Sequence, residues 1–294
     1  MYPLKEQSMF LASNWQDYEV LDTGNGEKLE RWGRYLLIRP DPQVIWPARD
    51  EKKWNSALAH YIRSDKGGGQ WDFREKLPEK WIVSYRDLKF YVRPTGFKHT
   101  GLFPEQAANW DAMDALIKTR PGARVLNLFA YTGGATVACA KAGAHVTHVD
   151  AAKGMVQWAK ENRELSGVPE TNCRFIVEDA LAFVRREIRR GNHYDGIVMD
   201  PPSYGRGPTG EVWKLENELY NLVSTCADVL SDEPLFYFIN SYTTGFQPAV
   251  LSNLLERCVK SRFGGKIDSE ELCIPVSSGG VLPCGATGRW ICEK

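Results

Sequence analysis

The sequence predicts an α/β fold with a mostly parallel sheet, closed by an antiparallel hairpin and preceded by a small α+β domain. From about residue 98, short apolar runs alternate with helix-length segments, which is typical of β-α-β units. Residues 270–294 read as strand, glycine-rich loop and strand, with no helix between them. Upstream, short apolar runs are separated by turn residues. We therefore expect a small domain over residues 1–95 and a larger one over residues 96–294.

The alternating pattern gives each element of the larger domain an approximate range. Apolar runs predict strands at residues 124–129, 145–150, 173–178, 196–200 and 235–240. Helical segments between and after them are predicted at residues 136–143, 154–167, 180–191 and 211–230.

In the small domain, turn residues separate short elements. Residues 18–47 predict strands joined by turns at Gly-Asn-Gly (24–26) and Pro-Asp-Pro (40–42). Residues 54–62 predict a short amphipathic helix. Residues 81–94 predict a hairpin that turns at Arg86 and Asp87.

Composition restricts the class of protein. The chain has 294 residues, 43% of them hydrophobic, and 37 Lys and Arg balance 37 Asp and Glu, so its overall charge does not favour nucleic acid or a membrane surface. The first residues lack the apolar core of a signal peptide, and no stretch approaches the ~18 apolar residues of a membrane span. We expect a soluble cytoplasmic protein without a membrane partner.

The cysteines predict neither a metal site nor a disulfide framework. The seven cysteines are scattered and odd in number, and none forms a C-x-x-C pair. Buried free thiols are therefore expected.

Polar groups follow four consecutive predicted strands, where a doubly wound sheet binds its ligands. They are the glycine turn "FAYTGGAT" at residues 129–136, Asp150, Asp179, and "DPPSYG" at residues 200–205. Each has a structural alternative: the glycines can form an ordinary turn, Asp179 can cap the next helix, and "DPP" can simply end a strand. Their joint occurrence favours a cofactor that carries a nucleoside.

The first turn indicates which nucleoside cofactor is suitable. A dinucleotide site needs G-x-G-x-x-G to approach a pyrophosphate, yet Phe129, Ala130, Tyr131 and Thr132 stand where the early glycines belong. A G-x-x-x-x-G-K-[ST] loop is also absent from the sequence. The pattern therefore suits a ribose and an adenine without a pyrophosphate, and a nicotinamide dehydrogenase is the least favoured alternative.

These motifs also carry a family resemblance. "VLNLFAYTGG", "HVTHVD", "EDALAFV" and "YDGIVMDPPSYG" resemble motifs I to IV of class I S-adenosylmethionine-dependent methyltransferases. With "TGLFPEQAANW" upstream, residues 85–294 are similar to the bacterial ribosomal RNA large-subunit methyltransferases, which modify cytosine carbon 5 or guanine nitrogen 7. The resemblance implies a Rossmann-like seven-stranded sheet, S-adenosylmethionine as cofactor and RNA as partner.

The resemblance also implies roles for individual residues. Thr100 and Gln106 would lie near the methionine end of the cofactor, and Asp150 would hold the ribose hydroxyls. Asp179 and Ala180 would contact the adenine edge. The glycine turn beside the carboxylate and sulfonium would be lined by Asn127, Ala130, Tyr131, Thr132 and Gly133.

The loop at residues 200–204 is the predicted catalytic segment. Asp200 would hold a donor group of the acceptor base and is also a predicted cofactor contact, while Pro201 and Pro202 stiffen the backbone. Ser203 adds a hydroxyl, and Tyr204 adds an aromatic face on which a flipped base could stack. Methyl transfer mainly requires alignment of nucleophile, methyl and sulfur, so no metal is expected.

Cytosine carbon-5 chemistry needs a thiolate, but "DPPSYGRG" and "INSYTTGF" contain no cysteine. We therefore favour methylation of a heteroatom, unless folding brings in a remote cysteine.

Substrate class depends mainly on the resemblance, because no RNA-binding module is evident. The four arginines of "VRREIRRGNH" are explained at least as well by a solvated helix face. The alternatives are a methyltransferase for a small molecule or a protein side chain, and a non-catalytic RNA-binding or cofactor-binding module. Nothing in the sequence indicates an oligomeric state.

Overall fold

The computed structural model describes residues 9–64, 68–206 and 212–293. Its contacts divide the chain into two compact units. The first comprises Met1–Phe10, Asn109–Leu272 and Cys284–Lys294, and the second comprises Leu11–Ala108 and Cys273–Pro283. A domain boundary at residue 95 stays a prediction; the second unit runs beyond that residue and includes the tip of the C-terminal hairpin.

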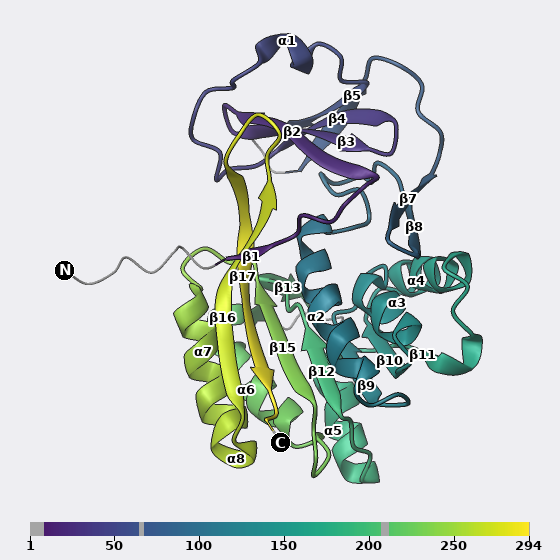
Figure 1. Cartoon of the computed structure of the whole chain (residues 1–294), viewed down its shortest axis with the longest axis vertical. Coiled ribbons are helices and arrows are strands. Elements are labelled where there is room, and N and C mark those ends of the chain that lie inside the picture. The colour runs from purple at the N-terminus through teal and green to yellow at the C-terminus, as the bar shows by residue number, and fades with distance from the viewer. Residues whose placement is uncertain (1–8, 65–67, 207–211, 294) are drawn as a thin grey trace, which may run out of the picture. The chain divides into compact units, whose positions relative to one another are not determined.

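The first unit contains a sheet with the strand order β1-β16-β17-β15-β12-β9-β10-β11 (Figure 1). Its parallel strands are β15 (Phe236–Ser241), β12 (Gly196–Met199), β9 (Arg124–Leu128), β10 (His145–Asp150) and β11 (Cys173–Val177). Strands β12 and β15 are buried along their whole length, as expected where helices cover both faces of a parallel sheet.

The antiparallel end of this sheet is the predicted hairpin. Strand β17 (Val281–Ile291) pairs antiparallel with β15 and continues from β16 (Lys266–Pro275). The α/β class and the C-terminal hairpin are therefore confirmed. The sheet has one strand more than the predicted seven because the two-residue β1 (Phe10–Leu11) joins it beside β16.

Helices follow the parallel strands of the first unit. Helix α3 packs against α4, and α5 packs against α6. The bounds are α2 (Ala107–Lys118), α3 (Gly134–Lys141), α4 (Lys153–Leu165), α5 (Ala180–Arg190), α6 (Leu215–Ala227), α7 (Pro248–Leu255) and α8 (Ser261–Phe263), with a 3-10 turn η2 (Glu170–Asn172) and a π-helical turn η3 (Glu256–Lys260).

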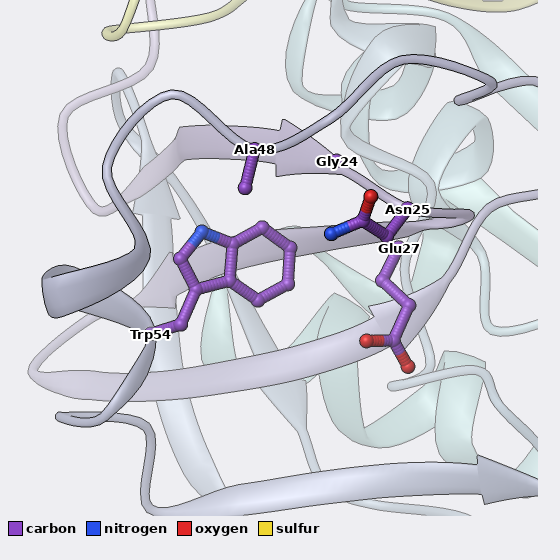
Figure 2. A pocket seen from close by; sticks show the side chains of 5 residues that line it. All are labelled: Gly24, Asn25, Glu27, Ala48 and Trp54. Carbon is purple, nitrogen blue, oxygen red and sulfur yellow. The ribbon is translucent and has the colours of Figure 1, made fainter.

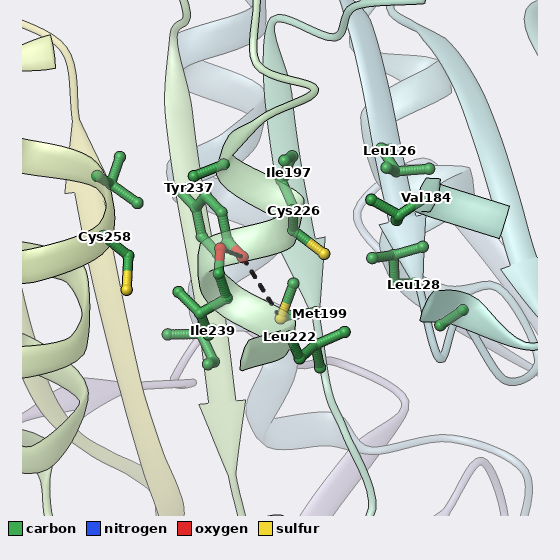
Figure 3. Close-up of a cluster of buried hydrophobic side chains, with 14 of the residues drawn as sticks. Leu126, Leu128, Val184, Ile197, Met199, Leu222, Cys226, Tyr237, Ile239 and Cys258 are labelled. Carbon is green, nitrogen blue, oxygen red and sulfur yellow. Dashed lines mark hydrogen bonds between the residues drawn. The ribbon is translucent and has the colours of Figure 1, made fainter. Parts of the chain in front are cut away.

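One large apolar cluster joins the sheet to α5, α6 and α7 (Figure 3). Leu126, Ile197 and Leu222 are fully buried in it. Tyr237 places its hydroxyl in the same cluster, 3.7 Å from the Met199 sulfur. Apolar burial of this kind fixes the strand positions and so the edge where the predicted site lies.

The second unit is a small α+β structure. Its five-stranded sheet runs β2-β3-β4-β5-β6, and β7 pairs with β8 in a separate ribbon. The strands are β2 (Tyr18–Gly24), β3 (Glu27–Trp32), β4 (Tyr35–Pro40), β5 (Ala59–Arg63), β6 (Gly69–Phe73), β7 (Trp81–Tyr85) and β8 (Leu88–Val92), and the helical turns are α1 (Glu51–Trp54) and η1 (Pro104–Gln106).

Two local predictions for this unit had different outcomes. The hairpin around Arg86 is confirmed, and Arg86 takes the left-handed turn conformation with φ 53°. The helix at residues 54–62 is wrong, because Ala59–Arg63 form strand β5 between β4 and β6. Ala59 and Tyr61 are buried while Ile62 is exposed, an alternation of period two that pairing with two neighbours stabilises.

The helix predicted at residues 211–230 begins later than expected. Residue 211 lies outside the described ranges, and Val212–Lys214 form strand β14, which pairs antiparallel with β13 (Tyr204–Arg206). Helix α6 therefore starts at Leu215. The ladder with β13 satisfies the backbone of these residues, so a β-ribbon follows the "DPPS" segment.

Candidate functional site

The carboxyl ends of the central strands lie at one level of the first unit's sheet. Leu128 at the end of β9 pairs with Val149 and with Met199. Asp150 pairs with Val177 at the end of β11. The chain order also reverses at β9, which has β10 on one side and β12 on the other. Such a switch point is where open α/β sheets bind ligands.

The turn after β9 has an unusual backbone. Phe129, Tyr131 and Gly133 all have positive φ values, at 54°, 50° and 84°. Left-handed conformations at two non-glycine residues are strained and persist only where other contacts enforce them. This turn is therefore held in a specific shape by its surroundings.

Asp150 is one of the groups that enforce this shape. Its Oδ2 accepts a hydrogen bond from the Tyr131 backbone N–H at 2.8 Å, and its Oδ1 accepts one from the Ala152 N–H at 2.8 Å. Each carboxylate oxygen can accept a further bond. Asp150 thus ties β10 to the turn while keeping acceptor capacity.

Gly133 allows the turn to approach helix α4. A Cβ at this position would lie 2.8 Å from the Ala159 Cβ. Asn162 of the same helix donates to the Thr132 carbonyl at 2.8 Å. Ala130, Thr132 and Gly133 are all buried. The glycine is needed here for packing and for its positive φ.

A buried polar chain lies behind this turn. Asn127 Nδ2 donates to Thr136 Oγ1 at 2.8 Å, and that hydroxyl lies 2.9 Å from His148 Nδ1. His148 is fully buried, and burial lowers its pKa to about 3, so the ring is neutral. The amide of Asn127, a predicted cofactor residue, is therefore anchored within the protein.

Asp179 caps helix α5, which was one of its two expected roles. Its Oδ1 accepts from the Ala182 backbone N–H at 2.8 Å. Asp179 is exposed, and its neighbour Ala180 is buried. The adenine contacts assigned to these two residues stay a prediction.

The loop after β12 is joined to the loop after β15. Ser203 Oγ lies 2.5 Å from Thr243 Oγ1, and the Ser203 carbonyl accepts from the Leu215 N–H at 3.1 Å. Trp213 Nε1 donates to the Pro202 carbonyl at 2.7 Å. Pro201 is buried, whereas Tyr204 keeps 52% of its surface exposed. The loop after β15 and the β14–α6 segment thus hold the "DPPSY" segment in place.

A second buried network supports the residue before Asp200. Asn240 Nδ2 donates to the Met199 carbonyl at 3.3 Å, and Asn240 Oδ1 accepts from Asn109 Nδ2 at 2.9 Å. Arg289 Nε donates to Asn109 Oδ1 at 2.8 Å. This network links α2, β15 and β17 to the end of β12.

Sequence reasoning did not assign Thr243, Trp213 or Asn240 to the site. Asn240 and Thr243 lie in "INSYTTGF", which was considered only as a place for a nucleophile. Trp213 lies in a segment predicted to be helical. The sequence does indicate that "INSYTTGF" follows a central strand, and ligand-binding loops are found at such strand ends.

The remaining predicted site residues, Thr100 and Gln106, belong to the second unit and are described within it. Thr100 is fully buried, and its Oγ1 has no hydrogen-bond partner among the described residues. Gln106 ends the 3-10 turn η1. An orphaned buried hydroxyl is a group that a ligand could satisfy.

The donor set fits an adenosyl sulfonium better than a dinucleotide. The turns at residues 129–133, 151–152, 178–179 and 200–203 contain no lysine or arginine, so they offer no cation for a phosphate. Asp150, Asp179 and Asp200 supply carboxylates at the same edge, which favour hydroxyl and amino donors and a cationic centre.

The described residues contain no cluster of three or more His, Cys, Asp or Glu side chains arranged for a metal ion. Nor does any helix in the described ranges have the length and apolar character needed to cross a bilayer. All seven cysteines are free thiols; four are buried, and Cys173, Cys284 and Cys292 are partly buried.

One cysteine lies closer to the site than its sequence position indicates. Ala286 on β17 pairs with Ser241 at the end of β15, and Cys284 precedes Ala286 on the same strand. A Cβ at the intervening Gly285 would lie 2.8 Å from the Tyr242 ring. Cys284 therefore lies beside the loop that follows β15.

Comparison with known proteins identifies relatives of this architecture. The family model of S-adenosylmethionine-dependent methyltransferases matches residues 34–229. The crystal structure of the SAM-dependent methyltransferase from Agrobacterium tumefaciens has a TM-score of 0.91 and 38% identity, covering 96% of this chain and 93% of that one.

Ribosomal RNA large subunit methyltransferase K of Neisseria meningitidis is 28% identical, over 74% of this chain and 64% of its own length. The K/L enzyme of Syntrophotalea carbinolica is 30% identical, over 61% of this chain and 25% of its own length. The matches thus leave more than a third of each curated relative uncovered. The family model and the solved structure show that the chain belongs to the S-adenosylmethionine-dependent methyltransferases, the family that its strand-end motifs resemble.

Proposed function

We propose that this protein methylates a heteroatom of a base in RNA, with ribosomal RNA as the favoured substrate. The observation that carries the proposal is the "DPPSY" loop at the switch point, fixed by Trp213 and Thr243 and ending on the exposed ring of Tyr204. The names of the relatives from Neisseria and Syntrophotalea support ribosomal RNA. A cytoplasmic location and a role in ribosomal RNA processing are part of this proposal.

S-adenosylmethionine supplies an activated methyl group, so the protein mainly has to bind, orient and desolvate the acceptor. Asp200 would accept a hydrogen bond from an amino or imino group of the base. Tyr204 would stack on the base, and the buried Pro201 would limit backbone movement. A nitrogen or oxygen acceptor is already nucleophilic, so no covalent enzyme intermediate is needed.

The cofactor would lie along the neighbouring strand ends. Asp150 would bind the ribose hydroxyls, and Asp179 with Ala180 would contact the adenine. Thr100 and Gln106 would serve the methionine end, together with the turn formed by Asn127, Ala130, Tyr131, Thr132 and Gly133. The free acceptor capacity of Asp150 and the orphaned Thr100 hydroxyl support these assignments.

The decisive experiment compares modified nucleosides in total RNA, by mass spectrometry, from cells with and without the gene. We expect one methylated nucleoside to disappear and to return when the purified protein acts on the unmodified RNA. Asp200→Asn should abolish the transfer while S-adenosylmethionine still binds in calorimetry. If no nucleoside changes, a small-molecule or protein substrate becomes the better explanation. Cofactor binding without transfer to any acceptor class would favour a non-catalytic module.

Cysteine-dependent carbon-5 methylation is a second candidate because β17 places Cys284 beside the loop after β15. A thiolate there could add to carbon 6 of a cytosine, and carbon 5 would then take the methyl group from the sulfonium. Removal of the carbon-5 proton by a base, such as a solvent hydroxide, would restore the double bond and expel the thiolate. Cys284→Ser should leave the rate unchanged if the acceptor is a heteroatom. Loss of activity, together with 5-methylcytidine as the missing nucleoside, would establish the carbon-5 reaction.

The cofactor assignment is tested most directly at Asp150. Asp150→Ala should weaken S-adenosylmethionine binding by ~1 to 3 kcal/mol, since it removes charged hydrogen bonds and releases the turn. Asp150→Asn keeps one side-chain acceptor and should lose less. His145→Ala, at the exposed opposite end of β10, is the matched control. Unchanged affinity of Asp150→Ala in calorimetry would rule out the ribose role.

A further inference from the structure

The second unit contains a small pocket away from any residue assigned above. It has a volume of about 200 Å³ (Figure 2). Its lining combines the aromatic ring of Trp54 with an amide and a carboxylate: Gly24, Asn25, Glu27, Ala48 and Trp54. Drug-sized ligands occupy pockets of ~300–1,000 Å³, so this one suits a single planar ring.

The ring of Trp54 is fixed before any ligand arrives. Its Nε1 donates to Asp22 Oδ2 at 2.9 Å, and Asp22 is fully buried. The same oxygen accepts from the backbone N–H groups of Arg49 and Asp50, at 3.1 and 3.0 Å. A rigid aromatic surface loses little entropy when another ring stacks on it.

The opposite wall of the pocket is equally constrained. A Cβ at Gly24 would lie 2.2 Å from the Ala48 backbone nitrogen, so strand β2 and the loop before α1 approach each other closely only because residue 24 is glycine. Asn25 sits in the adjoining turn with φ 55°, and its backbone N–H donates to the Trp46 carbonyl at 2.7 Å.

Two polar side chains complete the lining. The exposed Asn25 amide points toward the six-membered end of the indole in Figure 2, and it can both donate and accept. Glu27 offers carboxylate oxygens, one of which lies 2.5 Å from His60 Nε2. Helix α1 also carries the exposed Lys52 and Lys53, which precede Trp54 in the chain, and Lys53 Nζ lies 3.5 Å from Asp50 Oδ2.

We propose that this pocket binds one unpaired base of the RNA substrate, stacked on Trp54 and hydrogen-bonded along its edge by Asn25 and Glu27. Splayed bases of single-stranded RNA are recognised by aromatic stacking together with contacts to their edges. The lysines of α1 would meet the neighbouring phosphates. The carboxylate of Glu27 favours a base with an exocyclic amino group. This inference rests on RNA being the substrate.

The test measures binding of the full chain to a fluorescein-labelled single-stranded RNA of ~10 nucleotides, by anisotropy at fixed salt. Trp54→Ala should raise Kd by about 5- to 150-fold, the range of one lost base stack. Trp54→Phe should recover most of the affinity because a ring remains. Asn25→Gly keeps the left-handed turn but removes the amide, and it should also weaken binding.

Ile45→Ser is the matched control, since Ile45 lies in the same loop, is 89% exposed and does not line the pocket. Circular dichroism and urea denaturation check that each variant is folded, because the pocket lies in the second unit and most of the proposed cofactor residues lie in the first. RNA binding by the wild type that Trp54→Ala and Asn25→Gly leave unchanged would overturn the inference. Equal loss of RNA binding in Ile45→Ser and Trp54→Ala, without recovery in Trp54→Phe, would also overturn it, because the effect would then not come from stacking on Trp54. If the wild type neither binds nor methylates RNA, the proposed function itself fails.

Discussion

Each unit contains a polar centre that is fully or nearly fully buried, and these two centres differ in charge. In the second unit, Glu30 is fully buried and receives two hydrogen bonds from Arg39, at 2.6 and 2.8 Å, and one from Tyr18 at 2.6 Å. In the first unit, the Asn127–Thr136–His148 chain is also fully or nearly buried, and it contains no carboxylate.

The ionisation of each centre follows from its partners. Burial alone would raise the pKa of Glu30, but the Arg39 guanidinium and the nearby Lys28 lower it to about 2. His148 has no such counter-charge, so burial lowers its pKa to about 3. A buried charge is tolerated where a partner neutralises it, and a lone titratable group stays neutral.

The largest expected effect comes from breaking the charged centre. Glu30→Ala leaves the Arg39 guanidinium buried without its carboxylate, which should lower the free energy of unfolding by about 3–5 kcal/mol. Urea denaturation followed by circular dichroism measures this. The double variant Glu30→Ala, Arg39→Met should lose much less, because no unpaired charge remains. Equal losses in the single and double variants would mean that the pair is not the source of stability.

Local sequence patterns predict the buried parallel strands and one hairpin. The runs at residues 196–200 and 235–240 are apolar except for their last residues, Asp200 and Asn240, and they form the predicted buried parallel strands. A strand that is buried on both faces needs apolar residues at nearly every position, so the pattern is visible in the sequence. The hairpin at Arg86 is equally local, since the turn and both strands lie within one short segment.

Long-range pairing explains why other features could not be predicted from the sequence. Glu30 looks like an exposed residue in "EKLERW", and only the register of β3 with β4 places Arg39 diagonally across from it. Strand β5 was mistaken for a helix because its partners β4 and β6 decide its conformation. Thr243 contacts Ser203, and Cys284 lies beside the loop after β15, only through long-range contacts that no local sequence pattern contains.

Removal of the Thr136 hydroxyl from the neutral centre should lower the free energy of unfolding. Thr136→Val preserves the shape of the side chain but leaves the Asn127 amide and His148 Nδ1 without their partner, which should cost about 2 kcal/mol. Thr136→Ser keeps the hydroxyl and removes only a methyl group, so it should cost less in the same urea titration. A serine variant as unstable as the valine variant would show that packing, and not the hydrogen bonds, holds the centre.

The smallest expected effect is a difference in how the two centres change the stability of the protein with pH. The folded-state pKa of His148 lies below its unfolded value near 6.5, so its contribution to stability is complete above pH 6.5 and falls as the pH drops toward 3. At pH 5.5 this loss is about 1.4 kcal/mol. Glu30 begins to lose its contribution only below its ordinary pKa of 4.5, and it continues to do so down to about 2. His99 of the second unit, whose pKa burial lowers to about 4, must be followed separately.

Urea midpoints at pH 7 and 5.5 for the wild type, His148→Gln and His99→Gln separate these contributions. His148→Gln should remove its share of the pH dependence between those two values, and His99→Gln should remove a share of its own. If His148→Gln kept the full wild-type pH dependence, His148 would have to be able to take up a proton in the folded protein. The hydroxyl of Thr136 would then accept from a protonated Nδ1, and the contrast between a neutral and a charged buried centre would disappear. A hydroxyl that donates to a neutral Nδ1 requires the ring proton on Nε2, the nitrogen that has no partner among the described residues.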